Sequence, residues 1–153
     1  MGLLNYTTRI PAAQTAGEVQ GILAKHGARA VMIEYGDDGS AEALSFEIKR
    51  GDDPLGFRLP IEPDRILKVL QDEYDRGELR SHQGRPDREQ AVKVTWRILK
   101  VWVEAQMAYL QTEMVTMEQL FLPYLLTRDG KTLYQAMAEK RFLLGPGEGD
   151  KSG

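Results

Sequence analysis

The expected fold is decided by residues 88–109, which read REQAVKVTWRILKVWVEAQMAY. In a helix, at about 100° per residue, the apolar side chains of this stretch surround most of the axis and leave one narrow charged stripe. The stripe consists of Lys93, Arg97, Lys100 and Glu104. A helix so apolar is mostly buried, and buried charge is costly unless it is paired or meets a ligand. We therefore expect the stripe to face another helix, a subunit boundary or an anion.

Length and composition indicate one globular domain. The 153 residues are 42% apolar and 28% charged, with a formal net charge of -3, and the chain is long enough to bury a core. It has no cysteine, which excludes disulfides, zinc thiolate sites and cysteine nucleophiles. No apolar run approaches the roughly 20 residues that cross a bilayer, and the N-terminus does not resemble a signal peptide. We expect a soluble cytoplasmic protein.

Periodicity predicts a strand-rich first part upstream of this helix. The alternation of apolar and polar residues over 4–10 predicts a first strand, which Pro11 ends. Residues 15–18, TAGE, have the form of a capping box, so a helix is expected near 16–26, before Gly27.

Three further strands are predicted in the same part. The β-favouring runs 29–35 and 43–48 are separated by the turn sequence GDDG at 36–39, which indicates a hairpin. A short run at 56–59, before Pro60, predicts an edge strand.

The second part of the chain reads as helices. Helix signals predict a first segment from Pro63 to about Gly77. The long helix is expected to start at the Asp87 cap, with Gln90 three residues later, and to run through Tyr109. Two more helices are expected, one from Thr116 to a kink or end at Pro123 and one from Thr132 to Lys140.

These elements together predict an α+β fold. Its N-terminal antiparallel β-sheet with one helix is followed by a C-terminal bundle of α-helices that includes one long central helix. We expect a single domain over residues 1–145, sheet-rich over 1–60 and helical over 61–145. The glycine-rich, apolar-poor end 146–153 is expected to be a disordered tail.

Positive charge gathers in the middle of the chain. Between residues 76 and 100 there are seven Lys or Arg against three Asp or Glu. This local excess favours an anionic partner, although a solvated loop beside a well-paired helix explains it equally well.

Five residues are candidates for anion contact. Arg97 and Lys100 lie between Trp96 and Trp102 on the apolar helix, and guanidinium groups bind phosphate through two hydrogen bonds. The other candidates are the pair Phe57 and Arg58 on the expected edge strand, and Arg29 at the start of a strand. Each has a structural alternative: Phe57 in the core, Arg58 in solvent, and Arg97 as an ion-pair partner of Glu104 or Glu89.

Catalysis has no clear candidate in the sequence. His26 and His82 have no metal-ligand spacing, and no nucleophile elbow, Walker loop or dinucleotide fingerprint is present. Acidic pairs such as Asp37 and Asp38 lie in turns, where Asp satisfies backbone groups. We expect a protein without enzymatic activity, metal or cofactor.

An ordered set of motifs gives the chain a family resemblance that covers nearly all residues up to Gly145. The motifs are NYTTRIPA, EVQGILAKHGARA, LSFEIKR, GFRLP, AVKVTWRILKVWVEAQ, EQLFLPYLL, TLYQAM and FLLG. They resemble a family of small proteins from bacteriophages and mobile elements, namely the phage anti-defence proteins that counter the Thoeris system by sequestering its cyclic ADP-ribose-type signal.

This resemblance implies a non-enzymatic cyclic nucleotide sponge that acts in the cytoplasm of an infected bacterial cell. The implied assembly is an interlocked homo-oligomer with ligand near subunit boundaries. In that family arginines clamp the phosphates and an aromatic residue stacks on the adenine, and the positions here that are available for those parts are Arg29, Phe57, Arg58, Arg97 and Lys100. The chain departs from the family at Val101, where an acidic residue is frequent, and in the loop 80–88.

Two other functions remain open at the level of sequence. The basic loop at residues 76–85, RGELRSHQGR, and the strand with Phe57 and Arg58 suit a single-stranded nucleic-acid-binding accessory protein of phage replication or recombination. A proteinaceous inhibitor of a host defence enzyme is the second. A sequence pI of about 5.5 argues against general duplex binding, which is typical of domains with pI above about 9.

Overall fold

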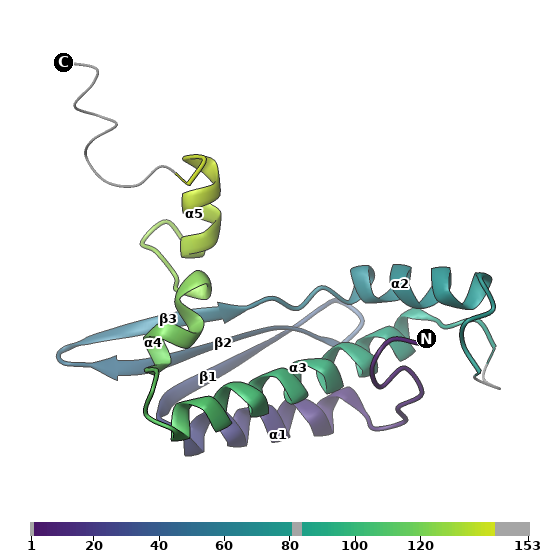
Figure 1. Cartoon of the computed structure of the whole chain (residues 1–153), viewed down its shortest axis with the longest axis horizontal. Helices are drawn as coiled ribbons and strands as arrows, with labels where there is room; N and C mark the ends of the chain where they lie inside the picture. Colours follow the sequence, from purple (N-terminus) through teal and green to yellow (C-terminus); the bar gives the residue numbers. More distant parts are fainter. Residues whose placement is uncertain (1, 81–83, 143–153) are drawn as a thin grey trace.

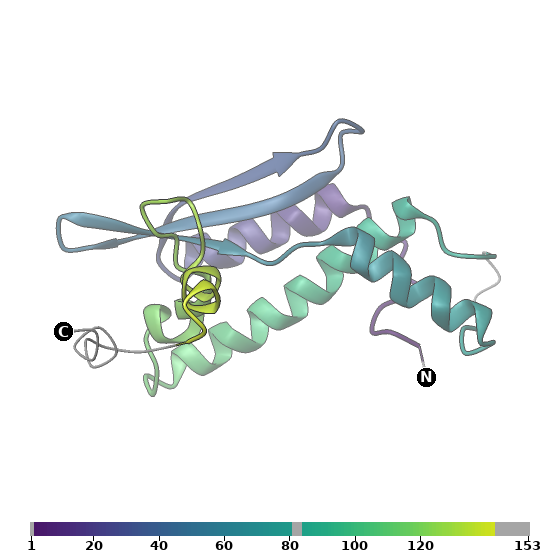
Figure 2. The ribbon, with the colours of Figure 1, turned by 90° about the horizontal axis from the view of Figure 1, so that it is seen from above.

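The computed structural model describes residues 2–80 and 84–142 of the chain, so the expected tail at 146–153 lies outside the described residues. The fold is α+β, as predicted, and begins with helix α1 (Ala12–Lys25). A three-stranded antiparallel sheet and a set of helices follow, and the long helix α3 (Arg88–Gln111) runs under the sheet beside α1 (Figures 1 and 2).

The sheet has the order β1-β2-β3, with β1 (Ala28–Tyr35), β2 (Ala41–Arg50) and β3 (Asp53–Leu59). The predicted hairpin and the predicted edge strand are both confirmed. The pairing of β1 with β2 shifts register between Ala28 and Ala30 and again between Glu34 and Tyr35. Such shifts are β-bulges, which place two successive residues against one on the neighbouring strand.

The main core lies between one face of the sheet and the helices α1 and α3. Phe46 stacks on Phe57 with ring centroids 5.1 Å apart, and Phe121 packs edge-on against Phe46 at 5.2 Å. Trp96 of α3 is fully buried, and its Nε1 donates a hydrogen bond to the carbonyl oxygen of Ala41 at 2.9 Å. A buried indole N–H needs such a partner. This bond therefore joins the long helix to the start of β2.

Helix α2 (Pro63–Asp75) packs on the N-terminal half of α3 and begins at Pro63, as predicted. Leu70, Ala91 and Val94 form a second, smaller core there. Asp87 caps α3 through the backbone N–H of Gln90, also as predicted.

The last elements are α4 (Met117–Phe121), the 3-10 turn η1 (Leu122–Tyr124) and α5 (Leu133–Glu139). Reciprocal capping boxes start α4 at Thr116 and α5 at Thr132. The regular helix ends before Pro123, as predicted, because proline cannot donate the next helical hydrogen bond. None of the residues of α5 is buried, and Figure 1 shows this helix standing away from the sheet.

The predicted strand at 4–10 is wrong. Residues 4–7 form a turn in which Asn5 has a φ of 62°, and the segment lies against α2 and α3. The side chain of Gln90 holds it there by donating to the carbonyl oxygens of Tyr6 and Thr8 at 2.9 and 2.8 Å. The alternating pattern therefore reflects docking on helices, since no strand pairs with this segment in the part of the chain that is described.

The expected start of the first helix is also wrong. Helix α1 begins at Ala12, after Pro11, and lacks a side-chain cap. Thr15 lies inside the helix and is fully buried, where its hydroxyl faces Arg97. Two alanines that favour helix extend α1 by one turn beyond the apparent capping box. Among the helices within the described ranges, none combines the length and the apolar content that a membrane span requires.

Candidate functional site

The charged stripe of α3 faces helix α1. The carboxylate of Glu18 lies 3.1 Å from the Arg97 guanidinium and 3.0 Å from the Lys100 ammonium. These two cationic side chains are only 18% and 19% exposed. The hydrogen bond from Lys100 lowers the pKa of Glu18, with further contributions from Gln14 and the charge of Arg97. Arg97 thus pairs with a residue of α1 within the chain, rather than with Glu89.

Arg29 and Arg58 lie on the opposite, open face of the sheet. Arg58 alternates with the buried residues Phe57 and Leu59 on β3, and its guanidinium reaches Glu34 of β1 at 3.0 Å. Arg29 lies beside Glu47, with Nε 3.7 Å from the carboxylate. Both arginines therefore occupy ion pairs that cross the strands.

The five predicted ligand residues do not form one site within a single chain. Arg97 and Lys100 are close to each other, whereas Arg29 and Arg58 lie across the sheet from them. Phe57 is fully buried between the layers, where it stacks on Phe46, so its faces are covered by protein. A base cannot stack on Phe57 in this arrangement.

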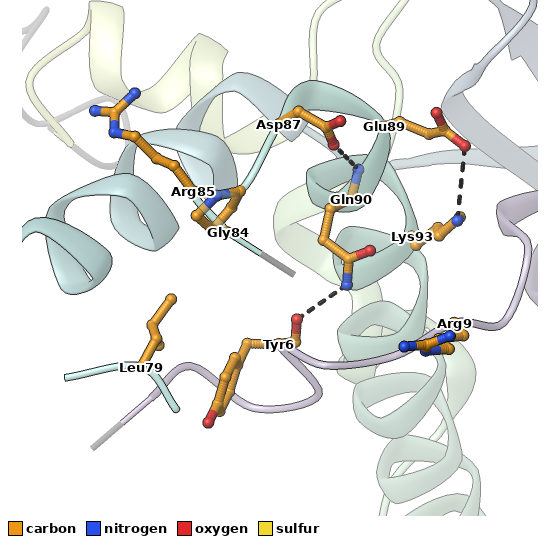
Figure 3. A pocket seen from close by; sticks show the side chains of 10 residues that line it. Tyr6, Arg9, Leu79, Gly84, Arg85, Asp87, Glu89, Gln90 and Lys93 are labelled. Atoms are coloured by element: carbon orange, nitrogen blue, oxygen red, sulfur yellow. Dashed lines mark hydrogen bonds and ion pairs between the residues drawn. The ribbon is translucent and has the colours of Figure 1, made fainter. Parts of the chain in front are cut away.

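A cavity beside the first turns of α3 brings together a more coherent set of side chains. We call this cavity the N-terminal pocket. Its volume is about 530 Å³, and Figure 3 shows it between the N-terminal segment, the residues around Arg85 and the first turns of α3. It is lined by Tyr6, Arg9, Leu79, Gly84, Arg85, Pro86, Asp87, Glu89, Gln90 and Lys93.

The charge of the N-terminal pocket favours an anion. Of the described residues that line it, three carry a cationic side chain and two a carboxylate. Arg85 is held by two hydrogen bonds to Asp75, both 3.1 Å long, which lower the pKa of that carboxyl, and in Figure 3 its guanidinium points away from the cavity. Arg9 and Lys93 lie on the other side, and the Lys93 ammonium points toward Glu89, 3.7 Å away. The basic part of the pocket is thus the pair Arg9 and Lys93.

The opposite wall of the N-terminal pocket is aromatic and apolar. Tyr6 presents its ring on the same side as Leu79, and its hydroxyl accepts a hydrogen bond from the backbone N–H of Arg80 at 3.3 Å. Gln90 fixes the backbone of Tyr6 from the other side. The ring is therefore held in place before any ligand binds.

A second large cavity, of about 670 Å³, lies between the end of β3 and α5. Arg58 lines it, together with Tyr124 and Tyr134, but so do Glu42 and Glu62. One cation against two carboxylates disfavours a phosphate-bearing ligand. The N-terminal pocket is the better anion site.

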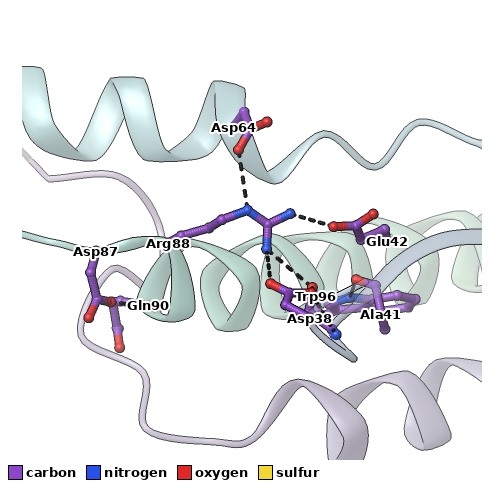
Figure 4. A network of polar contacts seen from close by, with 9 residues as sticks. Asp38, Ala41, Glu42, Asp64, Asp87, Arg88, Gln90 and Trp96 are labelled. Carbon is purple, nitrogen blue, oxygen red and sulfur yellow. Dashed lines mark hydrogen bonds and ion pairs between the residues drawn. The ribbon is translucent and has the colours of Figure 1, made fainter. Parts of the chain in front are cut away.

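Arg88 has a structural role near the N-terminal pocket. Its guanidinium contacts Asp38 at 2.7 Å, Glu42 at 2.5 Å and Asp64 at 3.5 Å, as Figure 4 shows. The hydrogen bond with Glu42 raises the pKa of Arg88, and the nearby carboxylates of Asp38 and Asp64 add to this. Arg88 joins the β1–β2 turn and the start of α2 to the first turn of α3.

Sequence reasoning missed Tyr6 and Arg9, and it placed Lys93 in the stripe without proposing a ligand contact. The assignment of residues 4–10 to a strand hid their position beside α3. The polar residues Asn5, Thr7 and Thr8, which are of types that suit turns, were the available signal.

The part of the chain described by the structure contains no group of three or more His, Cys, Asp or Glu that could hold a metal ion. Comparison with known proteins adds no relative: no family model matches the chain, and neither a curated protein nor a solved structure matches it significantly.

Proposed function

We propose that this protein binds a phosphate-bearing cyclic nucleotide in the N-terminal pocket and sequesters it without converting it. The observation that supports this most directly is that two cations, Arg9 and Lys93, line the same cavity as the fixed ring of Tyr6. Sequestration is also the activity of the phage anti-defence family that the sequence resembles.

The size of the N-terminal pocket suits such a ligand. Sites for small molecules occupy about 300–1,000 Å³, and a volume of about 530 Å³ lies within this range. The charge and the ring suggest the orientation of the nucleotide. Phosphate would lie at Arg9 and Lys93, because ionised donors form the strongest bonds to phosphate. The base would lie at Tyr6 and Leu79, where stacking contributes about 1–3 kcal/mol per base.

The charged stripe strengthens the field at the N-terminal pocket. Lys93 is followed along α3 by Arg97 and Lys100, and these two share a single carboxylate. Two cations thus lie near one carboxylate on the stretch of α3 that follows Lys93. Positive potential of this kind attracts an anion even though the whole protein is acidic.

The test incubates purified protein with cyclic ADP-ribose isomers and with cyclic di- and trinucleotides, then heats the complex and identifies the released compound. Release of intact ligand supports sequestration. Release of an altered compound would make the protein an enzyme, and failure to retain any nucleotide would overturn the proposal. Binding of single-stranded oligonucleotide with steep salt dependence, and without competition by cyclic nucleotides, would also overturn it.

A pair of matched variants locates the site. Lys93 and Lys68 each lie one helical turn from a carboxylate partner, Glu89 and Asp72 respectively. Lys93→Gln removes a cation from the N-terminal pocket, whereas Lys68→Gln removes one from α2, outside it. A charged hydrogen bond contributes about 1.5–3 kcal/mol, so we expect Lys93→Gln to weaken binding roughly 10- to 100-fold. Equal affinity in both variants would place the ligand elsewhere.

A further inference from the structure

Among the residues that the structure describes, no strand pairs with the outer edge of strand β1. It lies at one end of the sheet, and β2 is its hydrogen-bonded neighbour. The outer edge of β3 is different, because the backbone N–H of Leu126 donates to the carbonyl oxygen of Gly56 there at 2.8 Å. Two large apolar residues of β1 are exposed to solvent: 54% of the surface of Met32 and 63% of that of Tyr35 is accessible. An edge strand without proline or lysine is a template for pairing with another strand.

We propose that two copies of this chain associate through their β1 strands, antiparallel and centred on Met32, to form one continuous six-stranded sheet. In this register Met32 lies opposite Met32 of the partner, Val31 lies opposite the partner's Ile33, and Ala30 lies opposite the partner's Glu34. Val31 and Ile33 already pack against the core, so the partner strand extends that core across the boundary.

Charge selects this register. The bulge between Ala28 and Ala30 turns Arg29 to the open face, the face that also carries Met32 and Glu34. With the axis at Met32, Arg29 of each copy lies beside the partner's Glu34. If the two-fold axis of the dimer passed through Ile33, Arg29 would lie beyond the end of the partner strand. If it passed through Val31, Arg29 would lie against the partner's Met32.

The ion pairs within each chain extend this complementarity. Glu34 already pairs with Arg58, and Arg29 lies beside Glu47. Joining the two edges therefore produces a row of alternating charge across the sheet, in the order Arg58, Glu34, the partner's Arg29, the partner's Glu47. Opposite charges at neighbouring positions on a sheet face stabilise pairing.

Helix α1 supports the same surface. Gly17 and Gly21 lie within this helix, where each glycine costs about 1 kcal/mol relative to alanine. Within the described part of the chain, a Cβ built at either position would meet no atom within 4 Å outside the helix's own backbone, so packing there does not require glycine. Close approach of another backbone is a reason for glycine to be retained there.

Of the two glycines, Gly17 lies on the flank of α1 that the dimer would cover. Glu18 faces α3, and helical spacing puts Ala13, Gly17 and Ala24 on the opposite flank. Because α1 packs against β1, this flank lies below the open edge, at the margin of the molecule in Figure 1. In the proposed dimer the small residues of the two α1 helices face each other across the axis.

Disulfide trapping tests the register. Opposed residues of antiparallel strands have Cα atoms about 4.5–5.5 Å apart, within the range that a disulfide spans. The chain has no cysteine, so Met32→Cys introduces a single thiol. We expect mild oxidation to convert this variant to a species of twice the chain mass of 17.3 kDa. Val69→Cys, at an exposed position on α2, is the control. Equal yields from the two variants would overturn the proposal.

Charge reversal tests the complementarity. Arg29→Glu alone and Glu34→Arg alone each place like charges together in a homodimer, so we expect each variant to lose the dimer. An equimolar mixture restores both ion pairs in the heterodimer and should regain the doubled mass in sedimentation experiments. Circular dichroism confirms that each variant is folded. A wild-type protein that keeps the mass of one chain at millimolar concentration, or a mixture that stays monomeric, would refute the interface.

Discussion

The hydrogen bond between Trp96 and Ala41 gives a direct test of how α3 is attached to the sheet. Trp96 is fully buried, and its Nε1 lies 2.9 Å from the Ala41 carbonyl oxygen. Trp96→Phe removes the donor and leaves this carbonyl without its partner, which costs about 1–3 kcal/mol. The smaller ring also leaves a void that costs about 1 kcal/mol. We therefore expect a total loss of about 2–4 kcal/mol in the free energy of unfolding.

This loss is large beside the stability of a domain of this size. Native domains are stable by about 5–15 kcal/mol, and each kcal/mol shifts the melting temperature of a chain this long by about 2–4 °C. Urea unfolding followed by far-ultraviolet circular dichroism should thus show a clearly lower midpoint. The melting temperature should fall by roughly 5–15 °C.

Trp102→Phe is the matched control. Trp102 is only partly buried, and it packs edge-on against Phe121 and Tyr124 at 5.7 and 5.8 Å. Its indole N–H meets no acceptor among the described residues, so its replacement creates a void without stranding a carbonyl. We expect a loss of about 1 kcal/mol. Equal losses in the two variants would refute the reasoning, because the hydrogen bond would then contribute nothing.

Three further predictions concern the left-handed backbone at Glu113, the pH dependence of stability and the ion pairs of Arg88. Glu113 follows α3 with a φ of 62°, so Glu113→Gly should raise stability by about 0.5–1 kcal/mol in urea unfolding, whereas Glu113→Ala should not. A hydrogen bond from Lys100 lowers the pKa of Glu18, and one from Arg85 lowers the pKa of Asp75. Both carboxylates therefore stabilise the fold at pH values above their ordinary pKa values of 4.5 and 3.8, and this stabilisation is lost as the pH falls through the lowered pKa values. Melting temperatures measured between pH 7 and pH 3 should therefore fall less steeply for Glu18→Gln and Asp75→Asn than for wild type. Arg88→Lys should lower the melting temperature, because an ammonium group cannot reach Asp38, Glu42 and Asp64 together, and high salt should reduce the difference.

Local signals predicted most of the elements. The turn at 36–39, the caps at Asp87, Thr116 and Thr132, and the break at Pro123 each act through neighbouring backbone groups, so a short stretch of sequence contains the information. The edge position of β3 was also predicted from Pro60 and a short β-favouring run. These parts of the fold required no knowledge of distant contacts.

The strand prediction for the N-terminal segment was wrong because the structure of this segment depends on a distant contact. An alternating pattern predicts a strand only if another strand is present to pair with it. Here the decisive partner is Gln90, 84 residues from Tyr6, whose amide takes the place of a neighbouring strand. The candidate site failed with it, since Tyr6 and Arg9 reach the N-terminal pocket only because this segment crosses α3.

The charged stripe divides into two parts with different roles. Arg97 and Lys100 are mostly buried, and Glu18 offsets their desolvation while tying α1 to α3. Lys93 is more exposed, at 26%, and its partner Glu89 lies at the longer distance of 3.7 Å. Loss of Arg97 should therefore damage the fold before it affects a ligand, whereas loss of Lys93 should change the N-terminal pocket and leave the contact between α1 and α3 in place. Neither part includes a residue of β1, so ligand binding and association through the β1 edge can be tested separately.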